Sequence, residues 1–107
     1  SAVDGLLYAS YCLGAQGSIA AILSAAPGPS VKLWEATKAG DHVTALDLHE
    51  RLLVLWNAIV GDALPATTKC AQILQGIPAG LPRQPMSMPS ESKQAEIRKA
   101  LEGLDLV

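Results

Sequence analysis

Phenylalanine is absent from this chain of 107 residues, which holds only two Trp and two Tyr. Half of the residues are nevertheless hydrophobic, so the core must be built from Leu, Ala, Ile and Val. This hydrophobic share excludes disorder over most of the length. A chain of this size forms one domain at most and buries roughly two-thirds of its unfolded surface.

Net charge is also small. The formal net charge of −2 provides no basic surface for nucleic acid or for an anionic membrane. The longest stretch without a charged residue, 5–31, is interrupted by Gly, Pro, Ser and Tyr and has no basic segment before it. The sequence therefore predicts a soluble, cytoplasmic protein with neither a nucleic acid nor a membrane as its partner.

Cysteine is rare, and Cys12 and Cys70 lie far apart without a CxxC spacing or a neighbouring His. Two scattered cysteines in so apolar a chain predict reduced, buried thiols of a cytosolic protein. A disulfide between them is the less favoured alternative.

Motifs for metals, phosphates and activated serines are missing as well. His42 and His49 are seven positions apart on one predicted helix, roughly 10.5 Å along its axis, which is too far to chelate one ion. They are expected to face solvent or to cap a helix. No GxSxG occurs, and the turn at 14–17 lacks both GxGxxG and GK[ST]. The sequence thus predicts no metal site and no cofactor.

Lysine remains as a candidate nucleophile. Lys32, Lys38, Lys93 and Lys99 fall on predicted helix surfaces, where solvated side chains are expected. Lys69 lies among apolar residues and could be a partly buried nucleophile, although a hydrogen-bonded structural lysine is the favoured interpretation. The residues by themselves indicate no catalytic constellation.

The first part of the chain predicts a helix, a strand and a second helix. Asp4 is expected to cap the first helix, which Gly14 would end in a left-handed conformation. The apolar run 18–22 between two turns predicts a buried strand. After Pro-Gly-Pro, Ser30 is expected to cap the next helix. A single strand has nothing to bond its backbone to, so the position of its sheet is an open question.

The rest of the chain predicts three more helices. Gly40 ends one helix and Asp41 caps the longest, 41–60, whose apolar stripe repeats at helical spacing. Four residues of that stripe are expected to be buried: Leu48, Leu52, Leu55 and Ile59. Pro65 opens a further helix, the proline-rich connector 76–90 cannot be helical, and Ser90 begins the last helix. Its apolar face is formed by Ile97, Ala100, Leu101 and Leu104.

The order of these segments resembles a known family. The segments are SAVDGLLYASYCLGAQGSIAAILSAAP, AGDHVTALDLHERLLVLWNAI, LPATTK and GLPRQPMSMPS. Together they resemble the C-terminal part of the dihydrodipicolinate synthase / N-acetylneuraminate lyase family, where an SGxD turn precedes a GxxGxIS-type eighth barrel strand and a GD-capped helical hairpin. Within the family the chain is most similar to the 4-hydroxy-2-oxoglutarate aldolase-like branch.

The resemblance implies a mostly α chain: the C-terminal fragment of a (β/α)8 TIM barrel, with its last one to two strands, plus a helical C-terminal domain. Residues 1–40 would form the last βα units, with 1–4 ending strand seven and 18–22 forming strand eight, and 41–107 would form the helical domain. Neighbouring barrel strands would then supply the missing sheet. Without them, 18–22 is expected to pair with another chain or to join a helix.

The resemblance also implies a function. The family consists of class I, Schiff-base-forming lyases and aldolases that act on pyruvate or related 2-oxo acids, and its catalytic lysine lies on strand six, outside this chain. The chain alone is therefore expected to be inactive. Its implied partners are a small 2-oxo acid and either the remaining barrel half or a homo-oligomer partner. The alternative is a non-catalytic helical assembly module, suggested by the wide apolar stripe on 45–60.

Few site residues can be carried over from the family. Ile19 matches the strand-eight residue whose main-chain carbonyl lies beside the Schiff-base lysine. Asp4 matches the aspartate of the SGxD turn, which faces substrate hydroxyl groups in sialic-acid-type members. Ala2 replaces the usual glycine of that turn, while Ala20 and Ala21 stand where polar or small residues are frequent. These substrate-binding candidates argue against sialic acid and favour a small, plain 2-oxo acid.

Overall fold

The structure is a computed structural model that describes residues 2–107, and within this range it is mostly α-helical and contains no strand. The predicted helical character of the chain is thus confirmed. In chain order the elements are a 3-10 helix Asp4–Leu6, α1 Leu7–Cys12, α2 Ala21–Ala25, α3 Pro27–Lys38, α4 His42–Ile59, α5 Leu64–Leu74 and α6 Glu91–Glu102.

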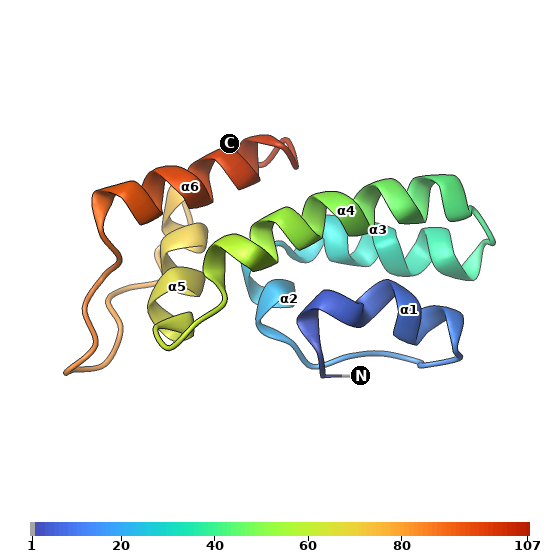
Figure 1. Cartoon of the computed structure of the whole chain (residues 1–107), viewed down its shortest axis with the longest axis horizontal. Coiled ribbons are helices and arrows are strands. Elements are labelled where there is room, and N and C mark those ends of the chain that lie inside the picture. The colour runs from blue at the N-terminus through green and yellow to red at the C-terminus, as the bar shows by residue number, and fades with distance from the viewer. Residues whose placement is uncertain (1) are drawn as a thin grey trace.

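The helices form an elongated body of 42 × 23 × 20 Å around α4 (Figure 1). α3 lies alongside α4, α6 crosses its second half, and α1 packs against both α3 and α4. α5 lies between α2 and α6. The segment that joins α1 to α2 runs along the lower edge in Figure 1, beside the N-terminus. No helix in residues 2–107 combines the length and the apolar character that crossing a bilayer requires.

α4 is the longest helix, as the apolar spacing predicts. Asp41 caps it by accepting a hydrogen bond from the Thr44 backbone N–H at 3.2 Å. Leu52, Leu55 and Ile59 are almost fully buried, whereas Leu48 is only half-buried. The prediction of the helix is therefore confirmed, and the prediction of burial holds for three of the four residues.

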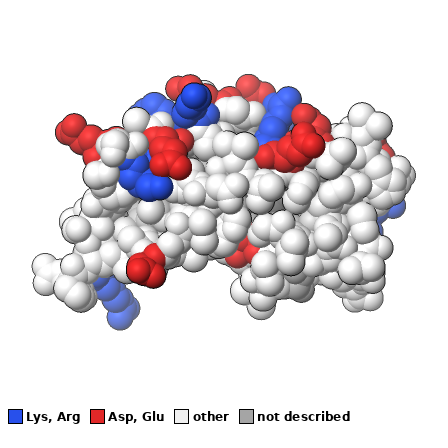
Figure 2. All heavy atoms as spheres, in the orientation of Figure 1, with Lys and Arg blue, Asp and Glu red and all other residues white. Residues whose placement is uncertain are grey.

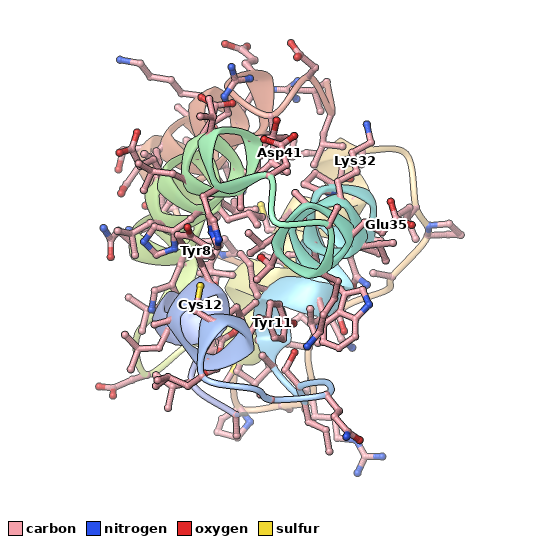
Figure 3. The ribbon with its side chains drawn as sticks, turned by 90° about the vertical axis from the view of Figure 1, so that its right-hand side faces the viewer. Tyr8, Tyr11, Cys12, Lys32, Glu35 and Asp41 are labelled. Carbon is pink, nitrogen blue, oxygen red and sulfur yellow. The ribbon has the colours of Figure 1, made fainter. Side chains whose placement is uncertain are left out.

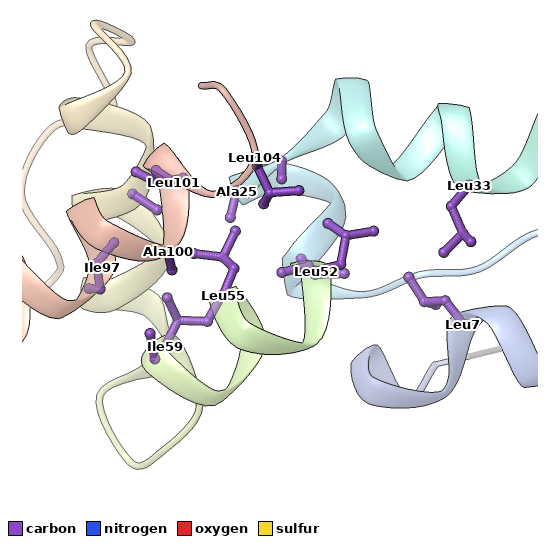
Figure 4. Close-up of a cluster of buried hydrophobic side chains, with 14 of the residues drawn as sticks. Leu7, Ala25, Leu33, Leu52, Leu55, Ile59, Ile97, Ala100, Leu101 and Leu104 are labelled. Carbon is purple, nitrogen blue, oxygen red and sulfur yellow. The ribbon is translucent and has the colours of Figure 1, made fainter. Parts of the chain in front are cut away.

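One hydrophobic core runs through all the helices (Figure 4). Leu55 lies at its middle with no exposed surface, and α6 contributes Ile97 and Leu101, which are equally inaccessible. Leu7 of α1 and Leu33 of α3 extend the core to the other end of the molecule. Residues before and after position 40 thus share one core.

The start of α3 differs from the prediction. The helix begins at Pro27, and Ser30 lies inside it, buried, with its hydroxyl donating to the Ala26 carbonyl at 2.6 Å. Proline is well tolerated in the first helical turn, because no helical partner exists there for its missing N–H. Ser30 is therefore not the cap of this helix.

The predicted strand 18–22 is not formed. Residues 18–20 lie outside any helix, with Ala20 extended at φ −157° and ψ 152°, while Ala21 and Ile22 belong to α2. The described chain offers no neighbouring strand, and alanine favours the helix. The expectation that the segment would join a helix is thus met in its second half. The strand expected at 1–4 is also absent from the described residues, since Asp4 begins the 3-10 helix; Ser1 lies outside them.

Tight turns hold the remaining elements in place. Gly14 and Gly40 have φ of 100° and 76°, so both adopt the left-handed conformation expected of helix-ending glycines. Pro65 lies in the first turn of α5, and the Ser90 hydroxyl caps α6 by accepting from the Lys93 N–H at 3.3 Å. The predicted helix starts at both positions are confirmed.

The two cysteines are free and lie in different environments. Cys70 is buried, and this burial raises the pKa of its thiol. Cys12 is exposed at the end of α1, so the prediction that both thiols are buried is wrong for Cys12. Cys12 is the last residue of α1 and lies outside the hydrophobic core that covers Leu7 and Tyr11 of the same helix.

Candidate functional site

Asp4 is bonded to the start of α2, which lies 18 positions further along the chain. Its Oδ2 accepts a hydrogen bond from the Ile22 backbone N–H at 2.8 Å. Neither the 3-10 helix nor α1 has a side-chain cap, so Asp4 does not cap its own helix as predicted. It instead satisfies an N–H in the first turn of α2, whose N-cap residue Ala20 has no side-chain acceptor.

This hydrogen bond brings three of the five predicted site residues together. Ala20 and Ala21 directly precede Ile22, and both are half-buried next to the Asp4 carboxylate. We call this group, Asp4 with Ala20 and Ala21, the Asp4 corner. One carboxylate oxygen is engaged by the helix, which fixes the position of the other.

The remaining two predicted residues, Ala2 and Ile19, line one open depression of about 500 Å³ together with Gly17 and Ser18. The Ile19 side chain is 87% exposed. Within the described residues, its backbone N–H and C=O make no hydrogen bond. The role of the Ile19 carbonyl beside a lysine stays a prediction, because no amine lines this depression in residues 2–107.

A second hollow, of about 280 Å³, was not anticipated from the sequence. Tyr11, Ser18 and Trp34 contribute to its wall. The Tyr11 and Ser18 hydroxyls are 2.8 Å apart, and the edge of the Tyr11 ring meets Trp34 at a centroid distance of 5.0 Å. The Lys38 ammonium lies 4.4 Å from the centre of the Trp34 ring. Trp34 and Lys38 lie one turn apart on α3, but Tyr11 and Ser18 come from other segments, so no local sequence pattern could place all four together.

Both histidines contact Tyr8, which Figure 3 shows on α1 close to Cys12. The Tyr8 hydroxyl and His42 Nδ1 form a hydrogen bond of 2.8 Å, and the rings of Tyr8 and His49 are 5.8 Å apart. Desolvation, followed by the nearby Cys12 thiol, raises the pKa of Tyr8. Residues 2–107 contain no cluster of three or more side chains suited to hold a metal ion. The prediction of capping or solvent-facing histidines missed the contact with Tyr8.

Lys69 of α5 is half-buried and donates to the Leu81 carbonyl of the connector at 3.0 Å. The favoured interpretation, a hydrogen-bonded structural lysine, is confirmed. This bond fastens the connector 76–90 to α5. Because α2 packs against α5, this bond also places the connector on the helix that borders the Asp4 corner.

Charged side chains are unevenly distributed over the face shown in Figure 2. Lys, Arg, Asp and Glu gather along its upper edge, over α4 and α6, whereas the lower part is largely uncharged. The segment between α1 and α2 runs along this lower part. A largely uncharged edge, in which the backbone groups of Gln16 and Ile19 make no hydrogen bond within residues 2–107, is suited to contact with more polypeptide.

Comparison with known proteins identifies similar chains. The sequence model of the dihydrodipicolinate synthetase family matches residues 1–104. The 4-hydroxy-tetrahydrodipicolinate synthase of Archaeoglobus fulgidus is 33% identical over 96 residues, which are 90% of this chain and 33% of that protein. The synthase of Methanopyrus kandleri is 33% identical over 107 residues, which are 100% of this chain and 36% of that protein.

The fold is similar to a solved structure as well. A crystal structure of dihydrodipicolinate synthase superposes with a TM-score of 0.85 and 28% sequence identity, over 100% of this chain and 37% of that chain. The chain thus spans about a third of the length of the relatives it matches. It belongs to the dihydrodipicolinate synthetase family, of which it represents the C-terminal, mostly helical part.

Proposed function

We propose that these residues are the C-terminal portion of a Schiff-base-forming lyase or aldolase that acts on pyruvate or a related 2-oxo acid. The observation that carries the proposal is the family match over residues 1–104. In this proposal, 1–40 are the last βα units of the barrel and 41–107 its helical C-terminal domain. Residues 18–20 of segment 15–20, the part of the predicted strand eight that lies outside α2, pair as a strand once their neighbours are present, and the complete protein works in the cytoplasm.

The proposed reaction joins the amine of a lysine to the keto group of the substrate. A lysine outside these residues attacks the keto carbon of the substrate, water leaves, and a protonated imine forms. The imine accepts the electron pair, and an enamine forms, when the carbon next to the imine carbon loses either a proton or its bond to the following carbon. We place the Ile19 carbonyl next to the imine and Asp4 towards the rest of the substrate. Ala2 narrows the pocket, and Ala20 and Ala21 line it without polar side chains.

Borohydride trapping tests this proposal. The complete protein, incubated with pyruvate and borohydride, is expected to gain one reduced pyruvate adduct on a lysine, detected by intact mass and peptide mapping. The 107-residue chain alone is expected to gain none. A stable adduct on that chain would show that it carries the nucleophile itself and would contradict the proposal.

The alternative function, a non-catalytic helical assembly module, was suggested by the apolar stripe of α4. Much of that stripe is covered within the chain, although Leu46 and Val60 stay exposed. Purification of the native protein separates the two functions. A native homo-oligomer whose subunits and companions lack the other barrel strands favours the module. A native chain that carries those strands, or a companion that does, favours the enzyme.

A further inference from the structure

A hollow of about 360 Å³ lies between α2 and α5, next to the Asp4 corner. Ala21 and Ser24 of α2 form one side, and Thr68, Lys69 and Gln72 of α5 form the other. Ala21 directly follows segment 15–20, whose residues 18–20 belong to strand eight in the proposed function. Active sites of (β/α)8 barrels lie at the C-terminal ends of the strands. The hollow would therefore open onto the mouth of the barrel, an argument that rests on the proposed function.

Next to this α2–α5 hollow lies another hollow, of about 310 Å³. Both contain Pro65 and Lys69, and the second adds Pro82, Arg83 and Met86 of the connector. α2 packs directly against α5. One wall thus extends from the Asp4 corner across α5 to the connector.

This wall carries two positive charges and no negative one. Lys69 gives one hydrogen bond to the Leu81 carbonyl, which leaves two N–H groups of its ammonium available. Arg83 is exposed, and the ion pairs within residues 2–107 include neither Arg83 nor Lys69. No Asp or Glu lines either hollow. Two cations that have no acidic partner within residues 2–107 create a local positive potential, although the chain has a net charge of −2.

We propose that Lys69 and Arg83 form an anion-binding wall that recognises a second carboxylate, at the end of the 2-oxo acid substrate remote from its keto group. The guanidinium of Arg83 can bind a carboxylate through two parallel hydrogen bonds, and Lys69 adds a compact charge. Lys69 also positions Arg83, because its bond to Leu81 holds the connector two residues away from Arg83. The substrate class is then a short dicarboxylic 2-oxo acid.

The test compares two ligands of equal chain length on the complete protein. The ligands are 2-oxoglutarate, which has the second carboxylate, and 2-oxopentanoate, which lacks it. Borohydride trapping and intact mass measure imine formation with each ligand. The wild type is expected to reach half-saturation at a 2-oxoglutarate concentration about tenfold to a hundredfold lower than the concentration of 2-oxopentanoate that it needs. This ratio is the effect on affinity expected of a hydrogen bond to a charged group. Arg83→Gln is expected to abolish this preference, and the exposed Arg98→Gln on α6 to keep it.

Lys69→Gln provides a second variant, since it removes a charge and also releases the connector. It is expected to reduce the preference and to speed tryptic cleavage after Arg83, which a change in charge alone would not do. Trapping of pyruvate without a preference for 2-oxoglutarate overturns the anion-binding wall only. Equal losses for both ligands in Arg83→Gln overturn it as well. Absence of any pyruvate adduct on the complete protein contradicts the proposed function itself.

Discussion

Thr67 and Thr68 are neighbours on α5, yet their hydroxyl groups have opposite surroundings. The Thr67 hydroxyl donates to the Ile59 carbonyl at 2.6 Å. Ile59 ends α4, so its carbonyl has no partner within its own helix. The Thr68 hydroxyl is buried and has no hydrogen-bond partner in the described part of the chain. One hydroxyl therefore joins two helices, while the other joins none within the described residues.

Valine has the shape of threonine and no hydroxyl, which makes it the matched replacement at both positions. Thr67→Val is expected to lower the free energy of unfolding by about 1–3 kcal/mol, because the Ile59 carbonyl stays buried without a donor. Thr68→Val is expected to leave that free energy unchanged or to raise it. Denaturant unfolding of the two variants measures both values. Equal losses at the two positions would contradict the assignment of these hydroxyls.

At the scale of elements, the cap of α4 depends on pH. The hydrogen bonds of Asp41 with Thr44 lower the pKa of its carboxyl below the ordinary value of 3.8. A carboxyl whose pKa is lower in the folded state stabilises that state while it is ionised. This contribution is present at neutral pH and disappears as the pH falls through 3.8 towards the lower folded value.

Asp41→Ala is therefore expected to lower the melting temperature most at neutral pH and progressively less below pH 3.8. Asp41→Asn keeps a neutral acceptor for the Thr44 N–H, so its melting temperature should fall less than that of Asp41→Ala. Its loss should also shrink less as the pH falls. Thermal unfolding followed by circular dichroism across this range measures both. A deficit of Asp41→Ala that is constant with pH would show that the charge of the cap has no effect.

Elements set by local signals were predictable from the sequence, and those that depend on distant contacts were not. α4 and α6 carry their own apolar spacing and their own caps, Asp41 and Ser90. The run 18–22 has the composition of a buried strand, but a strand forms only beside another strand, and the described residues provide none. Asp4 finds its partner Ile22 through the fold, so its position at the start of α2 could not be derived from nearby residues.

The same limit applies to the candidate site. The family motifs selected Ala2, Asp4 and the residues 19–21, and the structure places these along one edge. No motif indicated the pairing of Tyr8 with His42, which are 34 positions apart. Lys69 was singled out as partly buried, whereas its contact with Leu81 depends on the path of a connector that has no periodicity.

On the scale of the whole molecule, the chain combines a continuous core with one incomplete edge. The core extends from Leu7 to Leu104 and draws on α1–α6. The incomplete edge is segment 15–20, where the backbone groups of Gln16 and Ile19 make no hydrogen bond within residues 2–107. A body of this kind can hold its own fold and still offer a strand to further polypeptide.

The 107-residue chain alone is accordingly expected to self-associate through this edge, with an average mass in sedimentation that rises with concentration. Ile19→Lys places a charge on the extended segment and should shift the chain towards monomer, as lysines do on natural edge strands. Val43→Lys is the matched control, because Val43 is 85% exposed against 87% for Ile19 but lies in α4, a helix and not an extended segment. If Val43→Lys dissolved the oligomers equally well, exposed apolar area and not the unpaired backbone would drive association. A wild-type chain that stayed monomeric at every concentration would contradict the role given to segment 15–20.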